Sequence, residues 1–337
     1  MLGLERCGKQ TWHFHNPVYI QGTGTAVGPE ESKGPLADSF DICYDNLYAG
    51  EENWELAERR LMKDAVETAL KHAEKKSTEI DYFLAGDLLN QIVTSNYYAR
   101  ELEIPYLGLF SACATSMEGL ALASLFIDTG VANTSLVAVS SHNATAERQF
   151  RNPTEFGGQR PDTATFTVTG AGAIIVGNKP ATIKITEATI GKVLDLGIKN
   201  PFDMGSAMAP AAADTIVTHL KETKRDPSYY DVIVTGDLSR VGSGILRKLV
   251  QDKGIQLDRY EDCGVMIYHQ EQPVFAGGSG AACPAVVAFG HLLKEMNRGR
   301  IKRMLVVATG ALLSPLMMQQ KESIPCIAHA VSFEREE

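Results

Sequence analysis

Apolar residues recur at three- and four-residue spacing through residues 56–75, LAERRLMKDAVETALKHAEK, which predicts an amphipathic helix. A short apolar strand is expected after it, in IDYFLAGDLLN from Ile80. Far downstream, YYDVIVTGDLSRV from Tyr229 repeats this plan. The matching residues are Asp81, Gly86, Asp87 and Leu88 in the first segment and Asp231, Gly236, Asp237 and Leu238 in the second.

A second pair of segments follows in the same order. ACATSMEGLALAS from Ala112 matches ACPAVVAFGHLLK from Ala282, and each continues through a glycine to an apolar strand, at 135–139 and 304–308. Two ordered matches indicate an internal duplication. Uninterrupted apolar strands are typical of parallel strands covered by helices on both faces. We therefore predict an α/β protein of two similar halves, residues 1–180 and 181–337, joined near 177–182.

Composition narrows the class of protein. The chain has 337 residues, 44% of them hydrophobic, and a net charge of -9, which argues against nucleic acid as a main partner. No apolar stretch reaches the roughly 18 residues of a transmembrane helix, and the N-terminus lacks an apolar signal core. Six cysteines without a CxxC pair favour reduced thiols over a disulfide framework or a zinc site.

Cys113 lies where an extended segment enters a predicted helix, in GLFSACATSMEGL. Backbone N–H groups at a helix N-terminus lower the pKa of a thiol, and the same groups can hold an oxyanion or a carboxylate. A free cysteine among small residues is also commonly a plain buried side chain. The residues alone leave these three roles open.

SACATSMEGLALA and the duplicated halves resemble the thiolase superfamily, which includes condensing enzymes of the ketoacyl synthase III type. TFTVTGAGAIIVG, FAGGSGAACPAVVA and VVATGALLSP follow in the order expected for those enzymes. The resemblance implies a five-layered αβαβα sandwich. It also implies a cysteine that becomes acylated, two activating groups (His–His or His–Asn), and an oxyanion loop at Gly310 and Ala311.

The departures from those enzymes concern the activating groups. Thr235, Gly236 and Asp237 stand where the first histidine is expected, and Gly278 stands where the asparagine is expected. Neither threonine nor glycine can shuttle the proton, and an unassisted thiol with a pKa of about 8.5 is largely protonated at neutral pH. We therefore expect no catalytic residues and no enzyme activity, the alternative being an acyltransferase with a rearranged active site.

Several segments resemble a non-condensing branch of the superfamily, the stage V sporulation protein AD family of spore-forming bacteria. They are VYIQGTGTAVGPEESKGPLADSFD, GDLLNQ, FSACATSMEGLALAS, SSHNATAERQFR and DLSRVGSG. This resemblance implies non-catalytic binding of dipicolinic acid (pyridine-2,6-dicarboxylate), which enters the forespore during sporulation and leaves during germination. The implied partners are membrane-embedded SpoVA proteins, and the implied location is the cytoplasm or forespore, peripheral to the inner spore membrane. A homodimer is common in the superfamily.

We expect the ligand in the pocket that condensing enzymes use. The candidate binding residues are Cys113, His142, Thr235, Asp237, Gly278, Ser279, Gly310 and Ala311. In this interpretation Thr235, Ser279 and His142 donate hydrogen bonds, and one carboxylate lies at the N–H groups of Cys113 and the 310–311 loop. No cofactor is expected, apart from calcium that arrives with the ligand.

Asp237 has two alternative roles at this stage. Its carboxylate would repel a free dianion but could join the coordination of a bound calcium ion, which prefers oxygen ligands. It could equally cap the helix that follows, and Asp87 at the duplicated position favours a cap. Among Arg148, Arg151 and Arg160, at most one is expected to reach the pocket. Residues 198–215 could form a lid over its mouth, and an interface or core packing is an equal alternative for them.

Overall fold

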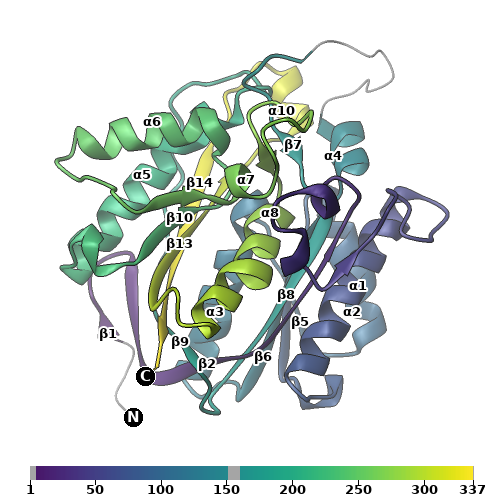
Figure 1. Ribbon diagram of the computed structural model, residues 1–337, viewed down its shortest axis with the longest axis vertical. Helices are drawn as coiled ribbons and strands as arrows, with labels where there is room; N and C mark the ends of the chain where they lie inside the picture. The colour runs from purple at the N-terminus through teal and green to yellow at the C-terminus, as the bar shows by residue number, and fades with distance from the viewer. Residues whose placement is uncertain (1–4, 151–159, 337) are drawn as a thin grey trace.

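The computed structural model describes residues 5–150 and 160–336 of the chain (Figure 1). The longer strands are β2 (Thr11–Val27), β4 (Tyr82–Gly86), β6 (Thr134–Ser141), β8 (Gly170–Gly177), β9 (Ile183–Thr189), β10 (Val232–Thr235), β13 (Arg303–Ala311) and β14 (Cys326–Arg335). The short strands are β1 (Glu5–Arg6), β3 (Ile42–Cys43), β5 (Tyr106–Gly108), β7 (Phe166–Thr167), β11 (Tyr260–Asp262) and β12 (Gly278–Ser279).

Helices alternate with these strands along the chain. The α-helices are α1 (Trp54–His72), α2 (Val93–Leu102), α3 (Thr115–Asp128), α4 (Asn143–Phe150), α5 (Met204–Thr223), α6 (Ser239–Gln251), α7 (Cys263–Met266), α8 (Ala282–Val286), α9 (Leu293–Asn297) and α10 (Pro315–Gln319). A 3-10 turn, η5 (Ala112–Ala114), leads into α3, and a π-helical segment, η8 (Val287–Leu292), joins α8 to α9. The helix predicted at 56–75 is therefore present as α1.

The strand order repeats itself within one sheet. Hydrogen-bonded neighbours follow the order β11-β10-β13-β14-β9-β2-β8-β6-β4-β5, so β9-β14-β13-β10-β11 mirrors β2-β8-β6-β4-β5. In each set the strands predicted as parallel are parallel, since β4 pairs with β5 and β6, and β10 pairs with β11 and β13. The two sets join where β2 pairs with β9, with Thr11 opposite Thr189.

Helices lie outside and between the two sets of strands (Figure 1). Helix α1 packs on β2 and β8 from one outer side, and α5 packs on β13 and β14 from the other. Helix α3 contacts both β6 and β13, so it lies between the two sets, as does α8. The arrangement has the five layers expected of an αβαβα sandwich. The sequence boundary at residue 180 lies between β8 and β9, and the division into two domains stays a prediction.

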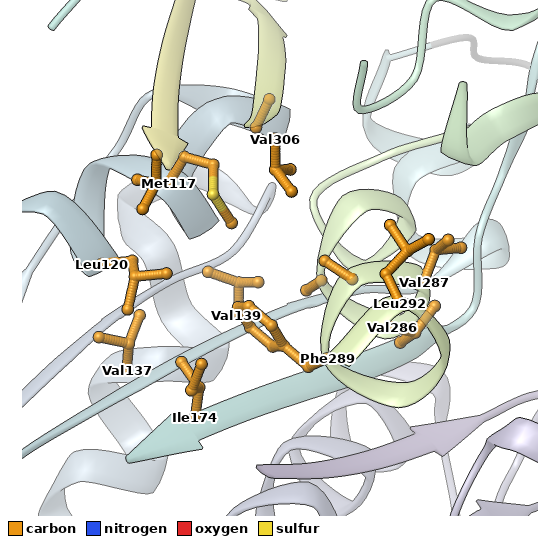
Figure 2. Packing of buried hydrophobic residues seen from close by; sticks show 14 of the residues in the cluster. Met117, Leu120, Val137, Val139, Ile174, Val286, Val287, Phe289, Leu292 and Val306 are labelled. Atoms are coloured by element: carbon orange, nitrogen blue, oxygen red, sulfur yellow. The ribbon is translucent and has the colours of Figure 1, made fainter. Parts of the chain in front are cut away.

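The middle layer holds the largest apolar cluster (Figure 2). Met117 and Leu120 of α3 pack with Val139 of β6, Phe289 of η8 and Val306 of β13, all fully buried. Each such side chain contributes about 1.5–3 kcal/mol when it is removed from water. This packing fixes α3, and with it the turn that carries Cys113, relative to strands of both sets.

Candidate functional site

Cys113 lies in turn η5, immediately before α3. Thr115 holds the turn, because its hydroxyl accepts from the Ser111 N–H at 2.9 Å and donates to the Ala112 carbonyl at 2.7 Å. Gly310 of β13 passes close to this turn, where a Cβ would lie 2.1 Å from the Ser111 carbonyl oxygen. A glycine is therefore required at 310 for β13 to approach the cysteine.

Asp237 follows β10 and is fully buried. Its Oδ2 accepts a hydrogen bond from the Gly280 N–H at 3.1 Å, its Oδ1 accepts from the Thr309 hydroxyl at 2.6 Å, and the Cys113 thiol also donates to the carboxylate. Burial raises the pKa of Asp237 to about 7, and the charge of Asp262 adds to this, while the three hydrogen bonds lower it. The carboxyl group therefore titrates near neutral pH.

The role of helix cap belongs to Asp262 rather than Asp237. The Asp262 carboxylate accepts from the N–H groups of Leu238 and Ser239, each at 2.9 Å, at the start of α6. It also accepts from the Val265 N–H at 3.2 Å, at the start of α7. Because Asp262 satisfies these donors, the carboxylate of Asp237 is left to face Cys113.

The duplicated position in the first half has different partners. Asp87 accepts from the Leu89 N–H at 2.9 Å and from the Ser95 N–H and hydroxyl at 2.8 and 2.7 Å. Asp87 thus bonds the chain that leads into α2, as a capping residue does. The sequence correspondence between Asp87 and Asp237 does not extend to their contacts.

Cys113 and Asp237 lie in the wall of one cavity. It encloses about 560 Å³ with its open mouth included. The cavity is lined by Leu88, Phe110, Ala112, Cys113, Ala146, Phe150, Thr167, Met204, Met208, Asp237, Ser279, Gly280, Ala311 and Leu313. Of the eight expected binding residues, the structure thus brings together Cys113, Asp237, Ser279 and Ala311.

Thr235, Gly278 and Gly310 lie next to lining residues without lining the cavity themselves. The Thr235 hydroxyl bonds to the Tyr260 hydroxyl and to Asp262, each at 2.6 Å. The Gly278 carbonyl accepts from the Ser239 hydroxyl at 2.7 Å. These contacts bind the site to the strands and helices behind it, so the three residues shape the cavity from outside.

The structure does not bring His142 to the cavity. Its Nε2 donates to the Leu47 carbonyl at 2.7 Å, and its Nδ1 accepts from the Ala144 N–H at 3.2 Å. Burial lowers the pKa of His142, which keeps the ring neutral in this arrangement. Both ring nitrogens are therefore engaged within the chain, and the expected hydrogen bond from His142 to a ligand is not available here.

The described arginines of the polar loop also lie elsewhere. Arg160 forms a two-point pair with Glu147, at 2.6 and 3.1 Å, and Arg148 lies over the Trp54 ring at 5.6 Å. Arg151 lies outside the described residues. Within 5–150 and 160–336, Cys113 and Asp237 are the ionisable side chains of the lining, and no lysine, arginine or histidine joins them.

Sequence reasoning missed most of the apolar wall. Leu88, Phe110, Phe150, Met208 and Leu313 reach the cavity from five different parts of the chain. Of these residues, Leu88 could have been found from the sequence, because it belongs to the duplicated Gly-Asp-Leu segment whose second copy contains Asp237. Residues 204–215 lie in the packed helix α5, which agrees with the core-packing alternative for this segment, and Met204 at the helix start lines the cavity.

Residues 5–150 and 160–336 contain neither a metal-binding cluster nor a membrane-spanning helix. No cluster of three or more histidine, cysteine, aspartate or glutamate side chains suited to a metal ion occurs there. None of the helices in those ranges combines the length and hydropathy that a membrane crossing requires.

Comparisons with known proteins give both a family and a fold. The family described as Stage V sporulation protein AD (SpoVAD) matches residues 8–334. Stage V sporulation protein AD of Bacillus subtilis (strain 168) is 57% identical over 333 residues, which cover 98% of this chain and 98% of that protein.

Solved structures of condensing enzymes share the fold at low sequence identity. One is 3-oxoacyl-[acyl-carrier-protein] synthase III from Aquifex aeolicus VF5, with a TM-score of 0.59 and 15% identity over 94% of this chain and 99% of that one. A variant of OleA from Xanthomonas campestris has a TM-score of 0.60 and 16% identity, covering 97% and 100% of the two chains. They confirm the thiolase-like α/β fold predicted from the sequence.

Proposed function

The chain belongs to the stage V sporulation protein AD family, and from this premise we propose that it binds dipicolinic acid without catalysing a reaction. In this proposal the ligand is held at the Cys113 cavity while it moves into the forespore during sporulation and out during germination. The protein acts at the surface of the inner spore membrane, held there by the membrane-embedded SpoVA proteins.

The character of the cavity is the observation that carries this proposal. Phe110, Phe150 and Met204 supply an apolar wall, and Cys113, Thr167 and Ser279 supply polar groups. Small-molecule sites commonly combine apolar walls with a few polar groups that fix orientation. Dipicolinate is a flat aromatic ring with two carboxylates, so its ring matches the apolar wall and its carboxylates match the thiol and hydroxyl donors.

The surroundings of Cys113 favour binding over catalysis. A thiol is activated by a neighbouring base or positive charge, and among the described lining residues its ionisable neighbour is a carboxyl group. An ionised Asp237 disfavours a second negative charge on the sulfur, and a protonated Asp237 cannot accept the thiol proton. In both states Cys113 stays a thiol that donates a hydrogen bond.

Calorimetry with dipicolinate, with and without calcium, tests the proposal. Benzene-1,3-dicarboxylate serves as a control ligand of the same outline that lacks the ring nitrogen. We expect heat and an increase in Tm for dipicolinate, and weaker effects for the control ligand. If neither dipicolinate nor its calcium chelate produces heat or a thermal shift, the protein is a scaffold with a vestigial pocket.

An acyltransferase with a rearranged site is the second candidate, because the solved structures of this fold are condensing enzymes and Cys113 lies at a helix start. Incubation with acyl-CoA esters followed by intact mass measurement separates the two. The binding proposal predicts an unchanged mass, and a stable acyl adduct on Cys113 supports the enzyme.

A homodimer through β5 is part of the proposal. Among the described residues, β5 is an edge strand of the sheet. Leu107 within it and Phe110 just after it are 39% and 47% exposed. Edge strands pair readily with a second chain, and exposed apolar side chains favour burial. Light scattering coupled to gel filtration tests this, since Leu107→Glu should convert a dimer to a monomer.

A further inference from the structure

Within residues 5–150 and 160–336, the groups around Asp237 include no positive charge that could balance a bound dianion. The groups that face its carboxylate are Cys113 from η5, Asp262 from β11, and the hydroxyl of Thr309 from β13. The thiols of Cys263, Cys283 and Cys326 lie near enough to feel its charge, and they come from α7, α8 and β14. All of these groups are neutral or negative.

A dicarboxylate that enters the cavity therefore meets a like charge out of contact with water. Adjacent buried carboxylates cannot all stay ionised, since their repulsion is poorly screened and each loses its hydration. Retreat of Asp237 is also blocked. Its two oxygens are fixed by the Gly280 N–H and the Thr309 hydroxyl, and it has no exposed surface.

Resting on the proposed function, we infer that the dipicolinate dianion binds only when Asp237 is in the acid form, so that an ionised Asp237 takes up one proton from solvent and the cavity selects the ligand together with a proton. When Asp237 is protonated, its own negative charge no longer opposes the two carboxylates of the ligand. Asp237 thereby becomes a specificity-determining residue, because it discriminates by charge between ligand states that have the same shape.

The contacts of Asp237 accommodate either protonation state. The Thr309 hydroxyl and the Cys113 thiol can donate or accept, so each can turn to accept from a protonated carboxyl oxygen. The Gly280 N–H can only donate, so Oδ2 remains the acceptor and Oδ1 carries the proton. Because burial raises the pKa of Asp237 to about 7, the acid form is within reach at neutral pH.

Titration calorimetry in calcium-free buffers measures the proton directly. Dipicolinate is titrated at pH 6 and pH 8 in two buffers that differ in ionisation heat, and the difference in observed heat gives the protons taken up. We expect close to one proton per ligand at pH 8, few at pH 6, and binding about tenfold weaker at pH 8, as linkage to a group that titrates near pH 7 requires. These measurements use the wild-type protein and need no variant.

Asp237→Asn and Asp87→Asn form a matched pair of variants. Asp237→Asn should bind dipicolinate at pH 8 as tightly as the wild type does at pH 6, with no proton uptake. Asp87→Asn changes a buried aspartate of the other half that does not line the cavity, and it should keep both the uptake and the pH dependence.

The outcomes separate the two proposals. Binding that is equally tight at pH 6 and pH 8, with no proton uptake, overturns this inference and leaves the proposed function standing. An absence of heat at both pH values and with calcium overturns the proposed function, and this inference with it. Proton uptake that persists in Asp237→Asn assigns the proton to another group and also overturns the inference.

Discussion

The thiol of Cys113 donates a hydrogen bond to the carboxylate of Asp237, and the two residues come from opposite sets of strands. Cys113 is placed by the turn before α3, and Asp237 by the end of β10. The pair changes what the sulfur can do, since a neighbouring carboxylate holds the thiol proton in place.

Loss of this thiol should weaken ligand binding without removing any turnover. At pH 6 Asp237 is mainly protonated, so the Cys113 thiol can donate to the ligand. We expect Cys113→Ala to bind dipicolinate roughly fivefold more weakly there, because one hydrogen bond of about 1 kcal/mol is lost. The measurement is calorimetry at pH 6. Cys43→Ala is the control, since that cysteine is exposed and does not line the cavity. An acyl-transfer rate in the wild type that disappears in Cys113→Ala would contradict the non-catalytic proposal.

Gly310→Ala should distort the site from behind. Its Cβ would lie 2.1 Å from the Ser111 carbonyl oxygen, so β13 or the turn before α3 has to move, at a cost of about 2 kcal/mol. Denaturant unfolding measures this loss, and calorimetry should show weaker dipicolinate binding.

Gly244→Ala is the matched control for Gly310→Ala. It adds the same methyl group inside α6, where nothing lies within 4 Å of the new Cβ. Alanine is the better helix former, so this variant should gain about 0.5 kcal/mol of unfolding free energy and leave binding unchanged. Equal losses in the two glycine variants would refute the close approach at Gly310.

Asp262→Ala should be the most destabilising of these single changes. It removes the acceptor for the N–H groups of Leu238, Ser239 and Val265 and for the Thr235 hydroxyl. Leaving several buried donors unsatisfied costs on the order of 3 kcal/mol or more. Asp226→Ala provides a comparison, because that aspartate caps an exposed turn through Ser228 alone. The free energy of unfolding in urea, measured for both variants, should fall much further for Asp262→Ala.

Stability should fall as the pH rises from about 6.5 to 8, because several buried carboxyl groups are held in the acid form. Below about 6.5 the buried His219 and His329, whose pKa values burial lowers to about 4, oppose this trend. Burial raises the pKa of Glu31 and Asp237 to about 7 and that of Glu58, beside the charge of Asp87, to about 8. The unfolded chain releases these protons above its ordinary carboxyl pKa values, whereas the folded chain keeps them until its own higher values are passed. The pH range between the two sets is therefore where stability is lost.

Scanning calorimetry at successive pH values measures this loss. Glu31→Gln should flatten the curve, because the amide oxygen can keep the bond that Glu31 accepts from the Thr169 N–H while the titration is gone. Glu322→Gln, at an exposed position, should not change its shape. A Tm that rises from pH 6.5 to pH 8 would contradict the raised carboxyl pKa values.

The fold could be predicted from the sequence because the chain contains an internal duplication. The matches of Asp81 with Asp231 and of Ala112-Cys113 with Ala282-Cys283 lie at the ends of strands and the starts of helices, where the backbone path constrains the residue. Buried parallel strands are continuous apolar runs, so their layers could also be predicted. These features depend on local patterns that a single chain displays.

Residues of the site could be predicted only where their position follows from a local junction between a strand and the helix or loop after it. Cys113 and Ala311 follow from the strand–helix and strand–loop junctions, and both line the cavity. His142 follows β6, as expected, but its ring donates a hydrogen bond to the Leu47 carbonyl, which lies 95 residues away in the chain. The capping prediction for Asp237 is wrong for the same reason. The N–H groups at the start of α6 bind Asp262, which lies more than 20 residues away in the chain, and not the nearby Asp237.

The pairing of β2 with β9 makes one hydrogen-bonded surface of both strand sets, from β5 at one margin to β11 at the other. Swinging the two sets apart along this seam would break backbone pairs such as Thr11 with Thr189. In the proposed function, the ligand would then enter past exposed lining side chains such as Phe110 as they change rotamers, while the two sets of strands keep their pairing. Exchange of the proposed ligand should accordingly be limited by side-chain rotation and should not require motion between the two sets of strands.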